Sequence, residues 1–141
     1  MNTTEQGDTV LSNGQVDDIV RVPEEDVIVY DSDDWIIVIP KTHNAAIYWG
    51  QNSEWDTSWK GGKMWFDIYS ASGDLIIIKH KHNPDQHYQF HIEKKLFFDR
   101  KNISVIFVEF FSQHVHLREA VIHYLQDNKE ILDEFNFLCN K

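Results

Sequence analysis

Residues Pro40 to Asp99 decide the fold of this chain, and they read PKTHNAAIYWGQNSEWDTSWKGGKMWFDIYSASGDLIIIKHKHNPDQHYQFHIEKKLFFD. This stretch predicts a fixed order of elements: a short helix that ends in glycine, a Trp-rich loop, a second helix, and a β-hairpin with polar residues on one face. A layout of this kind is typical of a segment that carries a site. It contains no motif whose chemistry can be named.

The two helices of this stretch are marked by their ends. Thr42 is a good N-cap residue, and Gly50 is expected to close the first helix because glycine tolerates the left-handed conformation. Residues 51–62 then form a loop. Apolar residues at helical spacing in 63–70 predict the second helix, which Gly73 ends.

The hairpin follows the second helix. A strand is predicted from Leu75 to His82, a turn at Asn83–Gln86, and a returning strand from His87 to Ile92, followed by a short strand at 96–98. Around that turn we expect His82 to face His87. Because side chains alternate along a strand, one face should then show a set of polar residues, and we predict that this face is solvated. Its members are His80, His82, His87, Gln89 and His91.

The flanking segments complete the fold class. Val27–Tyr30 and Trp35–Ile39 read as two strands joined by the turn Asp31–Asp34. After Asp99 the apolar period becomes helical, although residues 103–111 fit a strand as well as a helix. One helical face carries Leu117, Val121 and Leu125, and another carries Ile131, Leu132, Phe135 and Leu138. We predict an α+β fold, with an antiparallel β-sheet, helices packed on one face, and C-terminal helices.

Length and charge divide the 141 residues into a tail and a domain. Residues 1–17 are polar and without a period, so we predict a disordered or loosely attached acidic tail before a single domain at 18–141. Residues 1–34 carry ten carboxylates against Arg21 alone, which is −9 of the net charge of −10. Two interpretations remain open: a solvated tail, or an arm that meets a basic partner or imitates nucleic acid. The arm's binding residues would be Asp17, Asp18, Glu24, Glu25 and Asp26.

Several classes of protein are excluded or disfavoured by composition. No basic stripe is present, so direct binding to nucleic acid is not expected. No apolar run is long enough to span a bilayer and no secretory signal opens the chain, so we expect no membrane association and a cytoplasmic location in a host cell. Cys139 is the only cysteine, which excludes an internal disulfide framework and a cysteine-based zinc site.

A candidate site lies where the Trp-rich loop can cover the polar strand face. Gln89 and His91 are on that face, and the loop Trp55-Asp56-Thr57 is the candidate cover, with Tyr69 beside it. His91 and Asp56 are either an acid–base pair or a hydrogen-bonded histidine that fixes the loop to the sheet. The hairpin histidines are read as a polar face and not as zinc ligands, so neither a metal nor another cofactor is expected. Four tryptophans either stack a base or ligand or pack in the core and at its edge: Trp49, Trp55, Trp59 and Trp65.

The same stretch resembles an uncharacterised family of small phage and mobile-element proteins, whose pattern is G-x-x-T-x-W-C-T followed by Y-Q-F-H. The matching residues are Ile39-Pro40-Lys41-Thr42, Ala45-Ala46, Gly50, Trp55, Thr57, Tyr69, Gly73, Tyr88-Gln89-Phe90-His91 and Phe98-Asp99. Asp56 stands where the family has cysteine, and Ser53 where threonine is usual. The resemblance implies a phage-like origin and a common site, but no reaction.

These observations lead to one expected function and two alternatives. We expect a small acidic accessory protein of phage type that binds, and thereby inhibits, a macromolecular partner such as a host enzyme or defence factor. The partner would be a host or phage protein with a basic surface. The first alternative is an enzyme, or a degenerate one, with a pocket between Trp55–Thr57 and Gln89/His91. The second is a small-molecule sponge that uses the same pocket. Asp56 permits acid–base or binding roles, but not the covalent catalysis that a cysteine would support.

Overall fold

The computed structural model describes residues 19–140, and the predicted tail at 1–17 lies outside them. Five strands form one antiparallel sheet in the order β2 (Asp26–Asp31), β3 (Trp35–Pro40), β4 (Ile76–His80), β5 (His87–His91), β6 (Leu96–Asp99). The helices are α1 (His43–Trp49), α2 (Lys63–Ser72), α3 (Phe107–Gln113), α4 (Val115–Tyr124) and α5 (Lys129–Cys139), with short 3₁₀ turns η1 (Pro23–Glu25) and η2 (Asp56–Ser58). The α+β class with C-terminal helices is confirmed. None of the helices in 19–140 is long and apolar enough to cross a bilayer.

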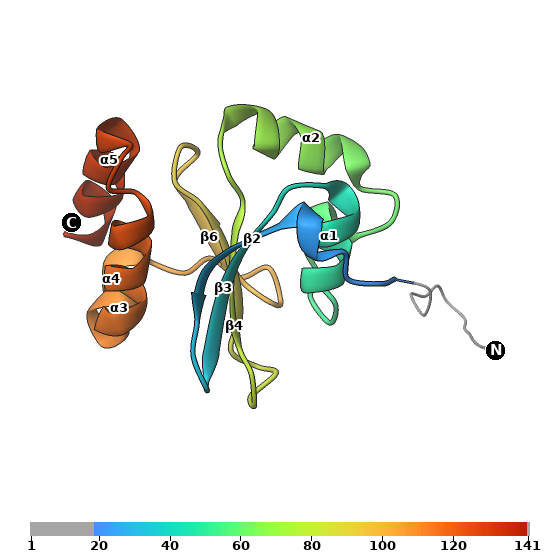
Figure 1. Cartoon of the computed structure of the whole chain (residues 1–141), viewed down its shortest axis with the longest axis horizontal. Coiled ribbons are helices and arrows are strands. Elements are labelled where there is room, and N and C mark those ends of the chain that lie inside the picture. The colour runs from blue at the N-terminus through green and yellow to red at the C-terminus, as the bar shows by residue number, and fades with distance from the viewer. Residues whose placement is uncertain (1–18, 141) are drawn as a thin grey trace.

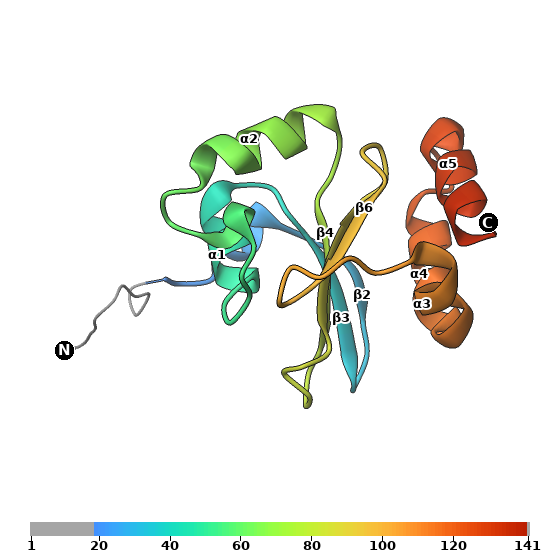
Figure 2. The same ribbon diagram turned by 180° about the vertical axis from the view of Figure 1, so that it is seen from behind.

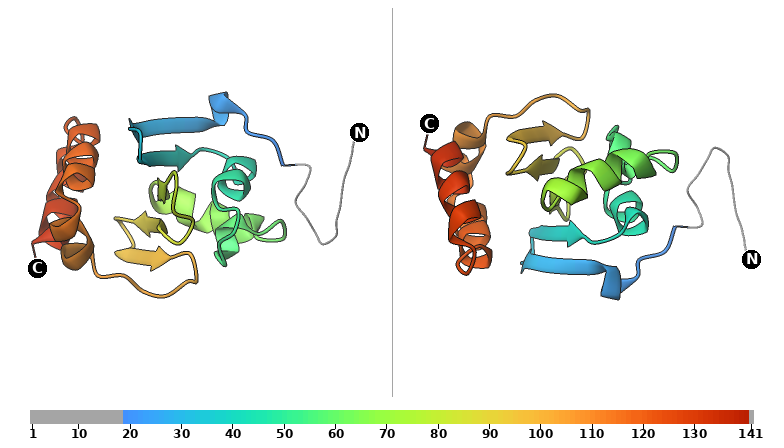
Figure 3. Two further views of the ribbon diagram at one scale, coloured as in Figure 1. Left: turned by 90° about the horizontal axis from the view of Figure 1, so that it is seen from below. Right: turned by 90° about the horizontal axis from the view of Figure 1, so that it is seen from above.

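Helices cover the sheet on both of its faces. The C-terminal helices α3, α4 and α5 pack on one face, as predicted, and α1, η2 and α2 form a further layer over the other (Figure 1). The reverse view and the two end views show the strands between these two layers (Figures 2 and 3). The layer formed by α1, η2 and α2 contains the Trp-rich loop, so it is this layer that positions the candidate site.

The larger core lies under the C-terminal helices and is built from phenylalanines. The ring of Phe90 on β5 lies 5.3–6.1 Å from four others, measured between centroids. These four neighbours are Phe97, Phe107, Phe111 and Phe135. Aromatic rings at such distances bury a large apolar area and favour edge-to-face contacts, so the predicted core face of β5 is confirmed.

Strands β3 and β4 are apolar on both sides because both sides are covered. Ile37 and Ile78 face the C-terminal helices, whereas Val38 and Ile77 face α1 and the Trp-rich loop. A strand buried on both faces reads as a continuous apolar run and not as an alternating one. The runs at 35–39 and 75–78 have this pattern.

The predicted pairing of the hairpin is wrong. Lys79, not His82, lies opposite His87. The turn at residues 83–86 does form, with the Gln86 amide donating to the Asn83 carbonyl at 3.0 Å. However, the pairing of β4 with β5 ends before this turn, so Lys81 and His82 have no partner on β5. His80 is therefore on the opposite side of the sheet from His87, and the predicted five-residue polar face does not exist.

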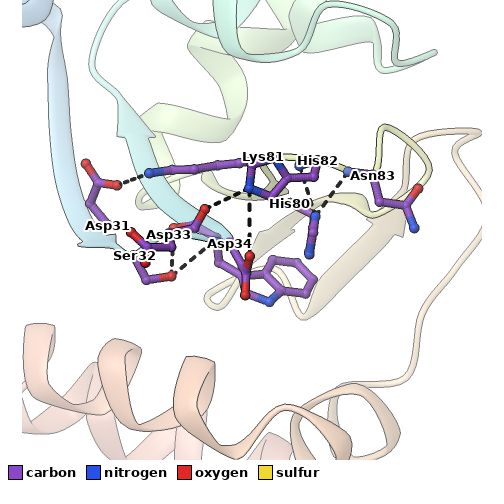
Figure 4. Close-up of polar contacts among 9 residues, drawn as sticks. Asp31, Ser32, Asp33, Asp34, His80, Lys81, His82 and Asn83 are labelled. Carbon is purple, nitrogen blue, oxygen red and sulfur yellow. Dashed lines mark hydrogen bonds and ion pairs between the residues drawn. The ribbon is translucent and has the colours of Figure 1, made fainter.

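Contacts with the neighbouring turn explain this departure (Figure 4). The Lys81 amide donates to the Asp34 carbonyl at 2.7 Å, and its ammonium pairs with the Asp31 carboxylate. His82 Nε2 donates to the Asp33 carbonyl at 3.0 Å. His80 Nδ1 accepts hydrogen bonds from the amides of His82 and Asn83, both at 3.1 Å, which bends the chain away from β5.

The predicted helix ends are largely confirmed, with one change of mechanism. Thr42 caps α1, its hydroxyl accepting from the Ala45 amide at 3.1 Å. Gly50 follows α1 but has φ −95°, so it is not left-handed. A Cβ at this position would collide with the Ser58 side chain, so glycine is needed for close approach. In the ambiguous segment 103–111, Ser104 bridges to Phe98 and the α-helix begins at Phe107.

Candidate functional site

The Trp-rich loop covers the polar residues of β5. The Thr57 hydroxyl donates to Gln89 Oε1 at 3.2 Å, and the indole of Trp55 donates to the Asp99 carbonyl at 2.7 Å. Trp55, Thr57 and Gln89 are all buried. The loop therefore lies against β5 and β6, in the position that the sequence predicted for it.

The histidines of β5 are buried and hydrogen-bonded, so their prediction as a solvated face is wrong. His87 Nε2 donates to the Trp49 carbonyl at 2.9 Å, and His91 Nε2 donates to the Tyr69 carbonyl at 2.8 Å. Each histidine thus ties the sheet to one helix of the covering layer, α1 or α2. The helix carbonyls provide buried acceptors, which is what a buried imidazole N–H requires.

Burial changes the titration of groups on this face. It lowers the pKa of His87 to about 4, because the imidazolium form is desolvated. The Trp49 carbonyl partly opposes this shift, whereas the positive charges of Lys79 and Arg100 add to it. Burial also lowers the pKa of Lys79, the cross-strand partner of His87. The face is therefore poorly suited to holding positive charge.

His91 and Asp56 are not arranged as an acid–base pair. Besides its bond to Tyr69, His91 accepts from the Lys94 amide through Nδ1 at 3.1 Å, so backbone groups occupy both ring nitrogens. The carboxylate that lies beside His91 is that of Glu93, 3.6 Å from Nδ1. Asp56 is exposed. Of the two interpretations, the hydrogen-bonded histidine fits the geometry, although it fixes α2 and the β5–β6 turn, not the loop.

A small cavity lies between the loop and the sheet. Its volume is about 90 Å³, and six predicted site residues line it: Trp55, Asp56, Thr57, Tyr69, Gln89 and His91. A cavity of this size has room for a few water molecules. Pockets for drug-sized ligands are typically ~300–1,000 Å³. The arrangement suits ordered water or a very small polar molecule.

The acidic residues proposed as a binding arm differ in their surroundings. Asp17 and Asp18 lie outside the described residues. Glu24 is exposed on η1, but Glu25 accepts from the Thr42 hydroxyl at 2.8 Å, and Asp26 accepts from the indole of Trp49 at 2.8 Å. Asp26 also pairs with Arg21 at 2.9 Å. Glu25 and Asp26 therefore attach the N-terminal end of the domain to α1.

The remaining histidines do not form a metal centre in this arrangement. His80 packs on Trp35, with 4.8 Å between ring centroids, on the side of the C-terminal helices. Within residues 19–140, no group of three or more His, Cys, Asp or Glu side chains is placed to hold a metal ion.

Four apolar residues are exposed on α2 and on the turn that precedes it. Trp59 is 66% exposed, Met64 61%, Trp65 43% and Ile68 44%. We call these four residues the α2 surface. The helix buries only Phe66, and α2 lies at the outer edge of its layer (Figures 1 and 2). The close spacing of these four apolar residues in the sequence indicates a common role, but it does not distinguish packing in the core from exposure on the surface.

Comparison with known proteins provides no assignment. No protein-family model, curated protein or solved structure matches the chain.

Proposed function

We propose that this chain is a non-enzymatic binding module that docks on a partner protein through the α2 surface. The observation that carries the proposal is the presence of two tryptophans, a methionine and an isoleucine, all exposed, within ten residues of one another on α2 and the turn before it. Other exposed large apolar residues, such as Ile103 and Val115, lie on separate elements. Scattered apolar residues are normal on a surface, whereas a cluster marks an interaction site.

The composition of the α2 surface matches that of interface centres. Tryptophan and methionine are enriched at the cores of protein interfaces, and tryptophan dominates the residues whose truncation costs most affinity. Ile68 comes four residues after Met64 and three after Trp65 in α2, so its side chain is a neighbour of both on the helix surface. An exposed amphipathic helix of this type inserts its apolar residues into a groove of the partner.

The cavity under the Trp55 loop supports an enzymatic function less well. It is small, and the two histidines that face it or lie near it are engaged with backbone carbonyls. A general acid or base needs a ring nitrogen within reach of the substrate. The alternatives of an enzyme or a small-molecule sponge therefore rank below the binding module.

Charge selects the kind of partner. The chain carries −10 at neutral pH, so approach to a basic surface is favoured and approach to an acidic one is disfavoured. Since −9 of this charge lies in residues 1–34, the partner that fits best is a protein with an apolar groove for the α2 surface and a basic surface that faces the N-terminal segment. Inhibition of that partner, as expected from the sequence, would follow if the groove is functional.

The test is affinity capture from a lysate of the source cells with three baits. The first is the native chain, and the second carries Trp59→Ser and Trp65→Ser. The third is a matched control with Ile106→Ser and Val115→Ser, which removes two exposed apolar side chains from the opposite layer. We expect one protein to be retained by the native chain and the control, and to be lost with the double tryptophan variant.

Two results would overturn the proposal. One is retention of the same partner by the tryptophan variant with unchanged affinity in a purified system. The other is self-association of the native chain in sedimentation that the tryptophan substitutions abolish, since the α2 surface would then be covered by a second copy. Circular dichroism of all three baits establishes that each is folded.

A further inference from the structure

We propose that a second surface of the chain binds a basic segment of a partner protein, which inserts one apolar side chain. This surface is a groove between the end of the sheet and the turn that joins α4 to α5. We call it the α4–α5 groove. It has a volume of about 280 Å³ and lies between the start of β4, the end of β5 and the first turn of α5. This inference rests on the proposal that the chain is a binding module, but it concerns a different part of the surface.

The floor of the groove is apolar. Ile76, Ile92, Leu125 and Ile131 line it, and Tyr124 contributes an exposed ring at its side. The first three are buried members of the large core, so the floor is held rigidly by the packing beneath it. A preformed apolar hollow favours an apolar side chain of the partner, because less ordering is required on binding.

The rim of the groove is acidic. Asp74, Glu93 and Asp127 line it, and an adjoining hollow of about 320 Å³ shares Glu93 and Ile131 and adds Glu130 and Glu134. Two lysines partly balance these carboxylates: Lys41 Nζ lies 3.4 Å from Asp74 and Lys95 Nζ lies 3.3 Å from Glu134. Five carboxylates against two ammonium groups leave the rim with a negative potential.

The pKa of a neighbouring phenol is consistent with this potential. Burial raises the pKa of Tyr124, and the negative charge of Asp74 raises it further, while Lys41 opposes the shift. Since no described cluster of carboxylates is arranged around a common point to hold a metal ion, separate cationic groups fit this rim better. Lys and Arg side chains spaced along a peptide meet that requirement, and an apolar residue between them reaches the floor.

The groove begins where α2 ends. Asp74 comes two residues after Ser72, the last residue of α2, and Gly73 between them packs so closely on the Glu93 carboxylate that a Cβ would collide with it. Gly73 has φ +155°, a conformation that side-chain-bearing residues rarely adopt. The two surfaces are therefore joined by a short, tightly packed connection, and one partner can contact both.

The experiment uses the full chain with isoleucine δ1-methyl labels and a short synthetic peptide in which single leucines are spaced among lysines. A second peptide with serine in place of each leucine tests the apolar anchor. Titration is followed by methyl NMR, in which Ile76, Ile92 and Ile131 report on the groove and Ile68 reports on the α2 surface. We expect the leucine peptide to shift the three groove methyls and to leave Ile68 unchanged.

Matched variants separate the groove from the overall charge. The groove variant carries Asp74→Asn, Asp127→Asn and Glu130→Gln, and the control variant carries Glu24→Gln, Asp33→Asn and Asp34→Asn. Both lose the same charge. We expect the groove variant to weaken binding of the leucine peptide at least about tenfold and the control variant less than about twofold, because close charge pairs contribute more than distant ones.

Each other outcome contradicts the inference. Equal weakening by both variants would show attraction to the net charge alone, and equal binding of the serine peptide would show that the floor is not used. Shifts confined to Ile68, with loss of binding in the Trp65→Ser variant, would place the peptide on the α2 surface; that result would reject the groove and leave the proposed function standing. Groove binding with no partner captured through the α2 surface would reject the proposed function alone.

Discussion

His87 on β5 donates a hydrogen bond from Nε2 to the carbonyl of Trp49, the last residue of α1, at 2.9 Å. The bond joins the sheet to the layer that carries the Trp-rich loop and the α2 surface. Burial lowers the pKa of His87 to about 4, so the imidazole is uncharged in the folded protein at neutral pH, although the bond to the Trp49 carbonyl by itself favours the charged form. The attachment of this layer is therefore linked to pH.

We predict that acid destabilises the fold through His87. The pKa falls from 6.5 in the unfolded chain to about 4 in the folded one, so the unfolded state binds more protons between these values. Stability is then fully present above pH 6.5 and is lost as the pH falls toward 4, by up to about 3 kcal/mol. Urea unfolding at several pH values measures the slope. His87→Gln should flatten it, whereas His123→Gln, at an exposed position on α4, should not.

The Thr57–Gln89 hydrogen bond should show a measurable coupling. Thr57→Val and Gln89→Leu each leave a buried polar partner without its bond, so each single change should cost about 1–3 kcal/mol of unfolding free energy. In the double variant both polar groups are absent, so the cost should be less than the sum of the two. A double-mutant cycle by chemical unfolding gives the coupling; strict additivity would show that the loop is not held by this bond.

The two glycines before α2 should respond differently to alanine. A Cβ at Gly62 would collide with the backbone carbonyl of Asp56, which has no freedom to move aside. At Gly61 the nearest atoms belong to the ring of Trp59, an exposed and rotatable side chain. We expect Gly62→Ala to cost about 1–3 kcal/mol, as overpacking usually does, and Gly61→Ala clearly less. Thermal unfolding of the pair provides the comparison, and equal losses would contradict the packing described for η2.

Phe90 should be among the most sensitive positions of the fold. Its ring is buried among four other phenylalanines, so Phe90→Ala should cost about 3–5 kcal/mol. Phe137→Ala provides the control, because the ring of Phe137 on α5 is 59% exposed and its removal leaves little cavity. Denaturant unfolding of both variants tests this, and a loss at Phe137 as large as that at Phe90 would be inconsistent with the core.

Cys139 should be chemically inert in the folded protein. The thiol is buried at the end of α5, and burial raises its pKa to about 12. Since the thiolate is the reactive form, iodoacetamide at pH 8 should leave the native chain unmodified and should label it in denaturant. Intact mass before and after treatment shows the result. Rapid labelling without denaturant would mean that the end of α5 opens readily.

Local signals in the sequence predicted most of the fold. Thr42 before an apolar helical period predicts the cap of α1, and the alternation in 87–92 separates Gln89 and His91 from Phe90. Both depend on residues close together in the chain. The same alternation puts Gln89 on the face for which the loop Trp55–Thr57 was the candidate cover, and Thr57 does bond to Gln89 there.

The features that could not be predicted depend on contacts between distant residues. The hairpin register follows from the bonds of Lys81 to Asp31, at the end of β2, and to Asp34, in the turn between β2 and β3. Burial of His87 requires the carbonyl of Trp49, 38 residues earlier. The sequence is compatible with Trp65 as a core residue or as a residue that stacks on a ligand, because an apolar spacing does not reveal whether another element covers the side chain. Its exposure depends on the number and position of the other helices.

Hydrogen–deuterium exchange of the chain, alone and bound to its captured partner, tests the central claim most directly. The account predicts that amides of 59–72, which include the α2 surface, exchange more slowly in the complex. Amides of α3, α4 and most of α5 should be unchanged. If exchange in 59–72 is the same in the free and bound chain while another region becomes protected, the α2 surface is not the docking site and the proposed function is contradicted.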